Sequence, residues 1–130
     1  MKNAICIPSS ILGVYAGLLA IEHGIFEMLQ GNTPTRGFMI HAIGSACQPE
    51  SIWHACFPAL TVIPNFFVTG IIAVILGLSA VVCSLEVTQK CRVMLFLSAL
   101  ILLFGGGFVP AYIGLPVWVA YAGFEKERCA

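Results

Sequence analysis

Charged side chains are scarce in this sequence of 130 residues, where Asp, Glu, Lys and Arg together make up only 9%. A soluble domain carries about 25% charged residues, which coat its surface. Hydrophobic residues here account for 59%, and the mean hydropathy is +0.98. The formal net charge is zero, so no basic surface points to nucleic acid as a partner. The composition therefore predicts a membrane protein, whose first partner is the lipid bilayer.

The motifs of common enzyme and metal sites are also missing. The sequence has no Cys-x-x-Cys pair, no nucleophile elbow, no glycine-rich phosphate loop and no His-Glu-x-x-His. His41 and His54 share a loop with Cys47 and Cys56, but their spacing matches no zinc finger or ribbon. We therefore predict no catalytic residue, no metal and no cofactor. A disulfide between Cys47 and Cys56 is chemically permitted outside the cytoplasm, and the sequence leaves it open.

Four apolar stretches are candidates for membrane spans, each of which needs about 20 residues. They cover residues 9–30, 57–85, 93–109 and 111–124, with a long outer loop at 31–56. The last stretch is short and follows a Gly-Gly-Gly-Phe-Val-Pro segment. It spans at an unusual length, continues the third helix after a kink, or is re-entrant. The predicted fold is all-α, a single domain over 1–130 built as a four-transmembrane-helix bundle with a short or kinked fourth helix.

The basic residues favour four spans with both termini in the cytoplasm. In that topology the cytoplasmic basic residues are Lys2, Lys90, Arg92, Lys126 and Arg128. Only Arg36 lies outside, which matches the positive-inside rule. Three spans would place the last two basic residues outside. We therefore predict a protein of the cytoplasmic (inner) membrane with cytoplasmic N- and C-termini.

Ionisable residues interrupt the first apolar stretch. Glu22, His23 and Glu27 lie where a signal peptide would have its cleavage region, so this stretch is predicted to be a retained helix. A charge inside a span costs a few kcal/mol unless it faces protein or water. We therefore predict that these three side chains face a ligand. Structural pairing, or an interfacial position for Glu27, is the alternative.

Small residues form a stripe on the same helix, close to the face of His23 and Glu27. It includes Gly13, Gly17 and Gly24, and the Gly13-x-x-x-Gly17 spacing lets two helices approach closely. This stripe is predicted to serve helix packing, and it is a candidate contact between two copies of the chain.

The second stretch carries polar residues at every fourth position, Thr61, Asn65 and Thr69, which form one stripe if the whole stretch is helical. Counted from the outer loop, Glu27 is level with Thr61, and His23 is level with Asn65. The glycine triplet ends the third stretch on the same side. We infer a polar pocket open to the outside. Alternatively, the Asn and Thr side chains bond a neighbouring helix or their own backbone.

Three segments resemble those of small, uncharacterised prokaryotic four-helix membrane proteins: AIEHGIFE at 20–27, WHACFPAL at 53–60 and FGGGFVP at 104–110. The resemblance covers most of the chain and implies the four-helix architecture, but it carries no activity. In length, helix count and a glutamate inside the first helix, the sequence is also similar to small multidrug-resistance exporters. It does not show their surrounding motifs, so this analogy assigns no substrate.

Three classes of function follow from these patterns. The first is homo-oligomeric transport or permeation, in which Glu22, His23 and Glu27 bind a cation or proton and Asn65 and the threonines complete the site. A path would form more easily between two copies, because four short helices make a thin bundle. The alternative is a non-catalytic accessory module, or a protein that binds a lipid or apolar ligand. A redox or lipid-modifying membrane enzyme is the third class, and missing paired cysteines argue against its redox form.

Overall fold

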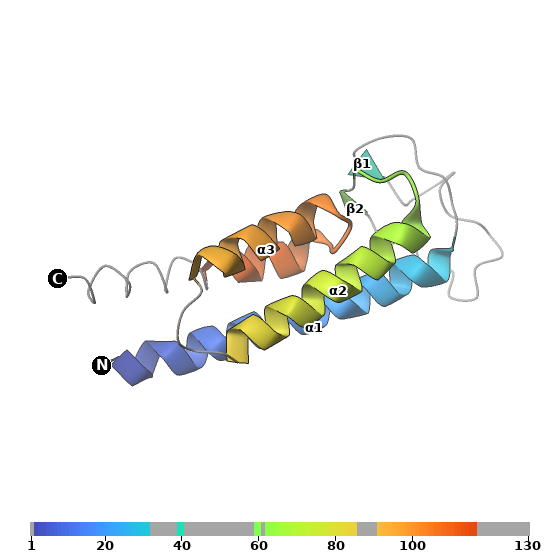
Figure 1. Cartoon of the computed structure of the whole chain (residues 1–130). Coiled ribbons are helices and arrows are strands. Elements are labelled where there is room, and N and C mark those ends of the chain that lie inside the picture. Colours follow the sequence, from blue (N-terminus) through green and yellow to red (C-terminus); the bar gives the residue numbers. More distant parts are fainter. Residues whose placement is uncertain (1, 32–38, 41–58, 61, 86–90, 117–130) are drawn as a thin grey trace.

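The computed structural model describes residues 2–31, 39–40, 59–60, 62–85 and 91–116 (Figure 1). The elements are helix α1 (Lys2–Gln30), strands β1 (Met39–Ile40) and β2 (Ala59–Leu60), helix α2 (Phe66–Leu85) and helix α3 (Cys91–Leu103). A further helix covers residues 108–116. The two strands form a short antiparallel ladder in which Met39 pairs with Leu60. Apart from this ladder, the regular structure of the described residues is helical, which confirms the prediction of a helical fold.

Helices α1 and α2 are the two described helices that are long and apolar enough to cross a bilayer. The apolar part of α1, Ile7–Leu29, has 23 residues, and α2 has 20 residues. Their mean hydropathies are 1.4 and 2.6. The two helices lie side by side along most of their length (Figure 1). Helix α3 and the 108–116 helix are shorter, so the four-span prediction is not confirmed among the described residues, where two helices have the length and composition of a span.

Glycines bring α1 and α2 into backbone contact. A Cβ added to Gly17 would lie 2.7 Å from the Gly77 carbonyl oxygen, and one added to Gly77 would lie 2.7 Å from that of Gly17. Gly24 and Gly70 form a second reciprocal pair, at 2.6 and 2.5 Å. The two pairs run in opposite directions along the chain, so the helices are antiparallel. Gly13 also faces α2. The glycine stripe of α1 therefore packs against α2 of the same chain, which occupies the face considered for a second copy.

Helix α2 begins at Phe66, later than the start near residue 57 that hydropathy predicts. Asn65 fixes this start because its Oδ1 accepts a hydrogen bond from Val68 N at 3.1 Å. Its backbone oxygen accepts the first helical bond, from Thr69 N at 3.0 Å. This is the geometry of an N-cap residue. Asn65 therefore precedes the helix instead of lying within a helical stripe.

The chain reverses direction at residues 105–107, hereafter the glycine turn. Gly105 and Gly107 have φ angles of +85° and +83°, a conformation that glycine adopts without a steric penalty. Beyond the turn, Gly114 lies against Ser98 of α3. The 108–116 helix therefore runs back along α3, behind it in Figure 1. The last apolar stretch begins a separate helix and does not continue α3.

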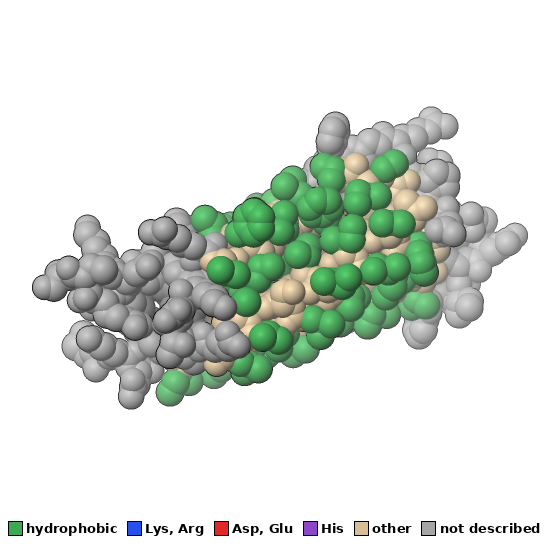
Figure 2. All heavy atoms as spheres, viewed as in Figure 1, with side chains coloured by type: hydrophobic (Ala, Val, Ile, Leu, Met, Phe, Trp, Pro, Cys, Tyr) green, Lys and Arg blue, Asp and Glu red, His purple; other side chains and the backbone are tan. Residues whose placement is uncertain are grey.

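Large apolar side chains cover the outside of this bundle, and its inside combines small residues with a few large apolar ones. Figure 2 shows hydrophobic atoms over the described part of the visible face, with no acidic or basic atoms among them. Ile11, Ile75 and Phe96 are 63%, 57% and 63% exposed. The core cluster is Ala20, Ala80, Met94, Leu97 and Ile101. Small residues between helices and large apolar residues outside are typical of packing in lipid.

Candidate functional site

Helix α1 places His23 and Glu27 one turn apart, near the end of its apolar stretch. His23 Nε2 lies 3.7 Å from Glu27 Oε1. This separation allows an ion pair when the histidine is protonated, but it is too long for a hydrogen bond. The side chain of Glu27 is 0% exposed and that of His23 is 15% exposed. His23 is therefore the accessible member of the pair, and Glu27 is the enclosed one.

The glycine turn covers both side chains. A Cβ added to Gly105 would lie 2.7 and 2.8 Å from the two carboxyl oxygens of Glu27, and 3.0 Å from Thr69 Cβ. A Cβ added to Gly107 would lie 3.0 Å from His23 Nδ1. Only glycine lets the backbone approach these groups so closely. The glycine turn is therefore a wall of the site as well as the end of a helical segment.

The carboxyl of Glu27 is buried without a hydrogen-bond partner among the described residues. The hydroxyl of Thr69 lies near this carboxyl. Its hydrogen bond, however, is donated to Phe66 O, at 3.0 Å. A hydroxyl has one proton to donate, so we take Thr69 to be committed to its own helix. Burying an ionised carboxylate without a partner costs several kcal/mol. Glu27 therefore requires a proton of its own, a protonated His23 beside it, or a cation or donor from outside the described chain.

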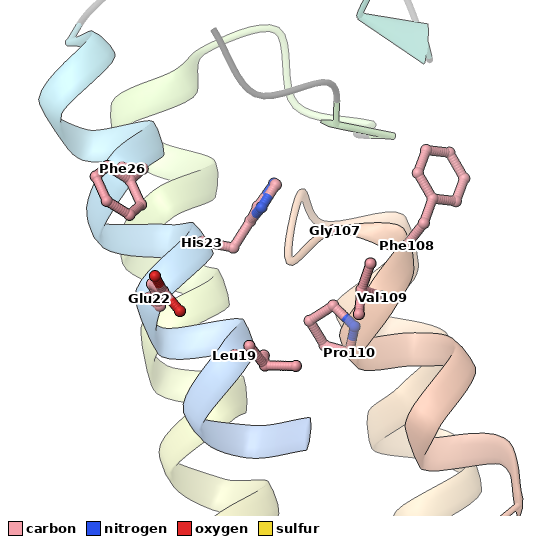
Figure 3. Close-up of a pocket in the computed structure, with 8 residues that line it drawn as sticks. All are labelled: Leu19, Glu22, His23, Phe26, Gly107, Phe108, Val109 and Pro110. Atoms are coloured by element: carbon pink, nitrogen blue, oxygen red, sulfur yellow. The ribbon is translucent and has the colours of Figure 1, made fainter. Parts of the chain in front are cut away.

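A pocket of about 500 Å³ opens beside this cluster, between α1 and the start of the 108–116 helix (Figure 3). Its wall on α1 consists of Leu19, Glu22, His23 and Phe26, and residues 107–110 form the other wall. The lining is mostly apolar, and the volume lies within the range of small-molecule sites. Because His23 lines the pocket and also adjoins Glu27, it connects the pocket to the buried carboxyl.

The site lies at a shallow depth in the apolar stretch of α1. His23 is six positions before Leu29, where that stretch ends. At 1.5 Å per residue this is about 9 Å along the helix. Glu22 lines the pocket one residue further in and is exposed. The polar groups of the pocket thus lie close to one end of the apolar stretch, and the remaining apolar length lies on the other side.

The structure brings together some of the predicted site residues and separates others. His23, Glu27 and Thr69 meet, and Glu22 lines the adjoining pocket. Asn65 caps α2 instead of completing a helical stripe, and Thr61 lies outside the described residues. The prediction that Glu27 is level with Thr61 assumed a helix from residue 57. Helix α2 begins at Phe66 instead, and the residue of α2 that lies beside Glu27 is Thr69.

The glycine and cysteine predictions have different outcomes. Gly13, Gly17 and Gly24 all face α2 within the chain. Cys47 and Cys56 lie outside the described residues, as do the two loop histidines. Within the described ranges, no three His, Cys, Asp or Glu side chains are grouped so that they could hold a metal ion.

Sequence reasoning missed the second wall of the pocket. Phe108, Val109 and Pro110 line it opposite α1, yet hydropathy reads them only as apolar residues beside a break. The sequence signal next to these residues was the glycine triplet, which directly precedes the 108–116 helix. In the structure this triplet lies against His23 and Glu27, and so places the start of that helix beside α1.

Comparisons with protein-family models, curated proteins and solved structures found no match to this chain. The family resemblance inferred from the sequence therefore stays a prediction, and the function is argued from the residues themselves.

Proposed function

We propose that this chain is an integral membrane protein that binds an amphiphilic or apolar small molecule in the pocket between α1 and residues 107–110. One observation carries the proposal. A pocket of about 500 Å³ has a mostly apolar lining, and its ionisable groups are Glu22 and His23. Ligand sites commonly combine an apolar surface with a few placed polar groups, which orient the bound molecule.

The surface of the bundle supports the membrane assignment. The core helix of a soluble protein is mostly buried, but only 33% of the most apolar part of α1 or α2 is buried. Gly17 and Gly24 of α1 each lie against a glycine of α2, and a cleaved signal peptide would not need such paired packing contacts. We propose that α1 is a retained span. The four-span topology with cytoplasmic termini in the inner membrane remains part of this proposal, and it rests on the distribution of basic residues.

The position of the pocket fits a ligand that arrives from the lipid. Its polar residues lie about 9 Å from the end of the apolar stretch, near the depth where head groups meet acyl chains. Leu19 lies one helical turn deeper than His23, on the same pocket wall. An amphiphile would place its polar group beside His23 and Glu22 and its chain along Leu19 and the opposite apolar wall.

A matched pair of tryptophan substitutions tests this proposal. Leu19 lines the pocket, whereas its neighbour Leu18 is 52% exposed on the outside. In native mass spectrometry of protein released from detergent, wild type should bind one copy of an added alkyl amphiphile. Leu19→Trp should fill the pocket and weaken this binding by about tenfold or more, whereas Leu18→Trp should bind like wild type. Equal binding by both variants would refute the pocket as the site.

Transport of a cation or proton by a homo-oligomer is the second candidate, and one observation favours it. Glu27 is a fully buried carboxyl inside an apolar helix, and ionisable residues in such positions commonly mark ion or proton pathways. In this proposal Glu27 exchanges a proton for a cation. A second copy would dock on a face other than the glycine stripe, because α2 already covers that stripe.

A further inference from the structure

We infer that the pocket selects amphiphiles with a cationic head group, such as an alkylammonium. This inference rests on the proposed function, because it names the class of ligand that the same pocket takes. It is drawn from the balance of charge around the pocket, from the enclosed carboxyl of Glu27 next to His23 and from the aromatic side chains that line the pocket.

Among the described residues, the charge around the pocket is acidic. The described ranges contain two acidic residues, Glu22 and Glu27, and both belong to this region. His23 carries at most one positive charge, so two ionised carboxylates would still leave an excess of negative charge. In an apolar, partly enclosed site, a carboxylate attracts a cation far more strongly than in water.

Basic residues of the described ranges lie far from these carboxyls. Lys2 is the first residue of α1, which puts it about 37 Å along the helix from Glu27. Arg92 is the second residue of α3, about 16 Å along that helix from its end at the glycine turn. The backbone of neither residue lies near Glu22 or Glu27. The described chain therefore offers these carboxyls no lysine or arginine.

The geometry of Glu27 provides an independent argument. Its side chain is 0% exposed, and neither carboxyl oxygen has a hydrogen-bond partner among the described residues. The carboxyl lies 3.7 Å from Nε2 of His23, which lines the pocket. A cation bound against His23 and Glu22 would bring positive charge towards this carboxylate, which no lysine or arginine of the described chain neutralises. An anionic head group would meet two carboxyls and, among the described residues, no lysine or arginine.

The aromatic residues also suit an ammonium group. Phe26 lines the pocket from α1, and Phe108 lines it from the 108–116 helix (Figure 3). The face of an aromatic ring attracts a cation, and quaternary ammonium groups are commonly bound in this way. The remaining wall, Leu19 with Val109 and Pro110, is apolar and accepts an alkyl chain.

Three probes with the same alkyl chain separate this inference from the proposed function. They are decyltrimethylammonium, decanol and decanoate, each titrated below its micelle concentration into protein in phosphatidylcholine nanodiscs, with empty nanodiscs as the blank. Wild type should bind the ammonium probe about tenfold more tightly than decanol, and decanoate should bind most weakly. Leu19→Trp should weaken ammonium and decanol binding alike.

Two near-isosteric variants assign the preference to the carboxyls. Glu27→Gln, at the buried position, and Glu22→Gln, at the exposed position, should each lower the ratio of ammonium to decanol affinity and leave decanol affinity unchanged. If decanol and the ammonium probe bind wild type equally, and Leu19→Trp weakens both, then the proposed function stands and the inference is overturned. If no probe binds wild type above the empty nanodiscs, the inference and the proposed function both fail.

Discussion

Two groups of glycines bring other segments of the chain close to helix α1, and they do so for different purposes. At Gly17 and Gly24, glycine lets the backbone of α2 approach, and the contacts are made by carbonyl groups and apolar side chains. At the glycine turn it lets a different segment close over polar side chains, where Gly105 lies against the Glu27 carboxyl and Gly107 against His23. The first contact holds two apolar helices together. The second encloses a carboxyl at an energetic cost, which a purely structural contact would avoid.

The difference between the two regions indicates where the chain favours function over stability. Small residues at a helix interface in lipid improve van der Waals packing and bury no unpaired group. An enclosed carboxyl without a partner is a liability, and such features concentrate at functional sites. Substitutions at Gly105, Gly17 and Glu27 test whether the glycine turn serves function in this way, rather than packing alone.

The largest effect is expected at Gly105. In Gly105→Ala, the new methyl group would overlap the Glu27 carboxyl, and the φ of +85° would add backbone strain. We expect a loss of about 3 kcal/mol in the free energy of unfolding, measured by circular dichroism during denaturation in detergent. Part of this loss, about 1 kcal/mol, should be recovered when Glu27→Ala is added, because the overlap is removed.

Gly17→Ala is the matched control for that experiment. Its methyl group would meet the Gly77 carbonyl oxygen and Val81 of α2, and neither contact involves Glu27. Its cost of about 1–3 kcal/mol should therefore be the same with and without Glu27→Ala. If Glu27→Ala leaves the cost of Gly105→Ala unchanged as well, the contact between the turn and the carboxyl is not what distinguishes the two regions.

A smaller effect of opposite sign is expected at Glu27. Glu27→Met replaces an enclosed carboxyl that has no hydrogen-bond partner among the described residues by an apolar side chain of similar length. Replacing buried charged groups by apolar ones is often neutral or stabilising, so the free energy of unfolding should be unchanged or rise by about 1 kcal/mol. In the same variant the preference for decyltrimethylammonium over decanol should fall. Destabilisation by more than about 2 kcal/mol would show that Glu27 holds the fold together.

The sequence predicted those parts of the fold that depend on local composition. Scarce charge and long apolar runs identified helices, and the ionisable residues of α1 stood out because they interrupt such a run. The start of α2 was missed because the apolar run continues through residues 57–63, and hydropathy does not register that Asn65 caps the helix. A capping residue and a polar residue inside a span look the same in a hydropathy window.

The pocket could not be predicted because it depends on contacts between segments far apart in the chain. His23 and Gly107 are separated by most of the sequence, and no periodicity within either segment indicates that they meet. The reversal of the chain after α3 was equally hidden, since an apolar helix that continues and one that folds back have the same composition. The glycine triplet marked the place of the change, but its direction required the tertiary contacts of Gly114 with Ser98.

Photolabelling with a decylamine that carries a diazirine on its alkyl chain tests the central claim most directly. The protein would be irradiated in phosphatidylcholine nanodiscs, and the labelled residues would be located by tandem mass spectrometry. Our account predicts labels concentrated between Leu19 and Phe26 of α1 and at residues 107–110, reduced by an excess of decyltrimethylammonium. Labels spread evenly over outward residues such as Ile11 and Ile75, and insensitive to that excess, would contradict it.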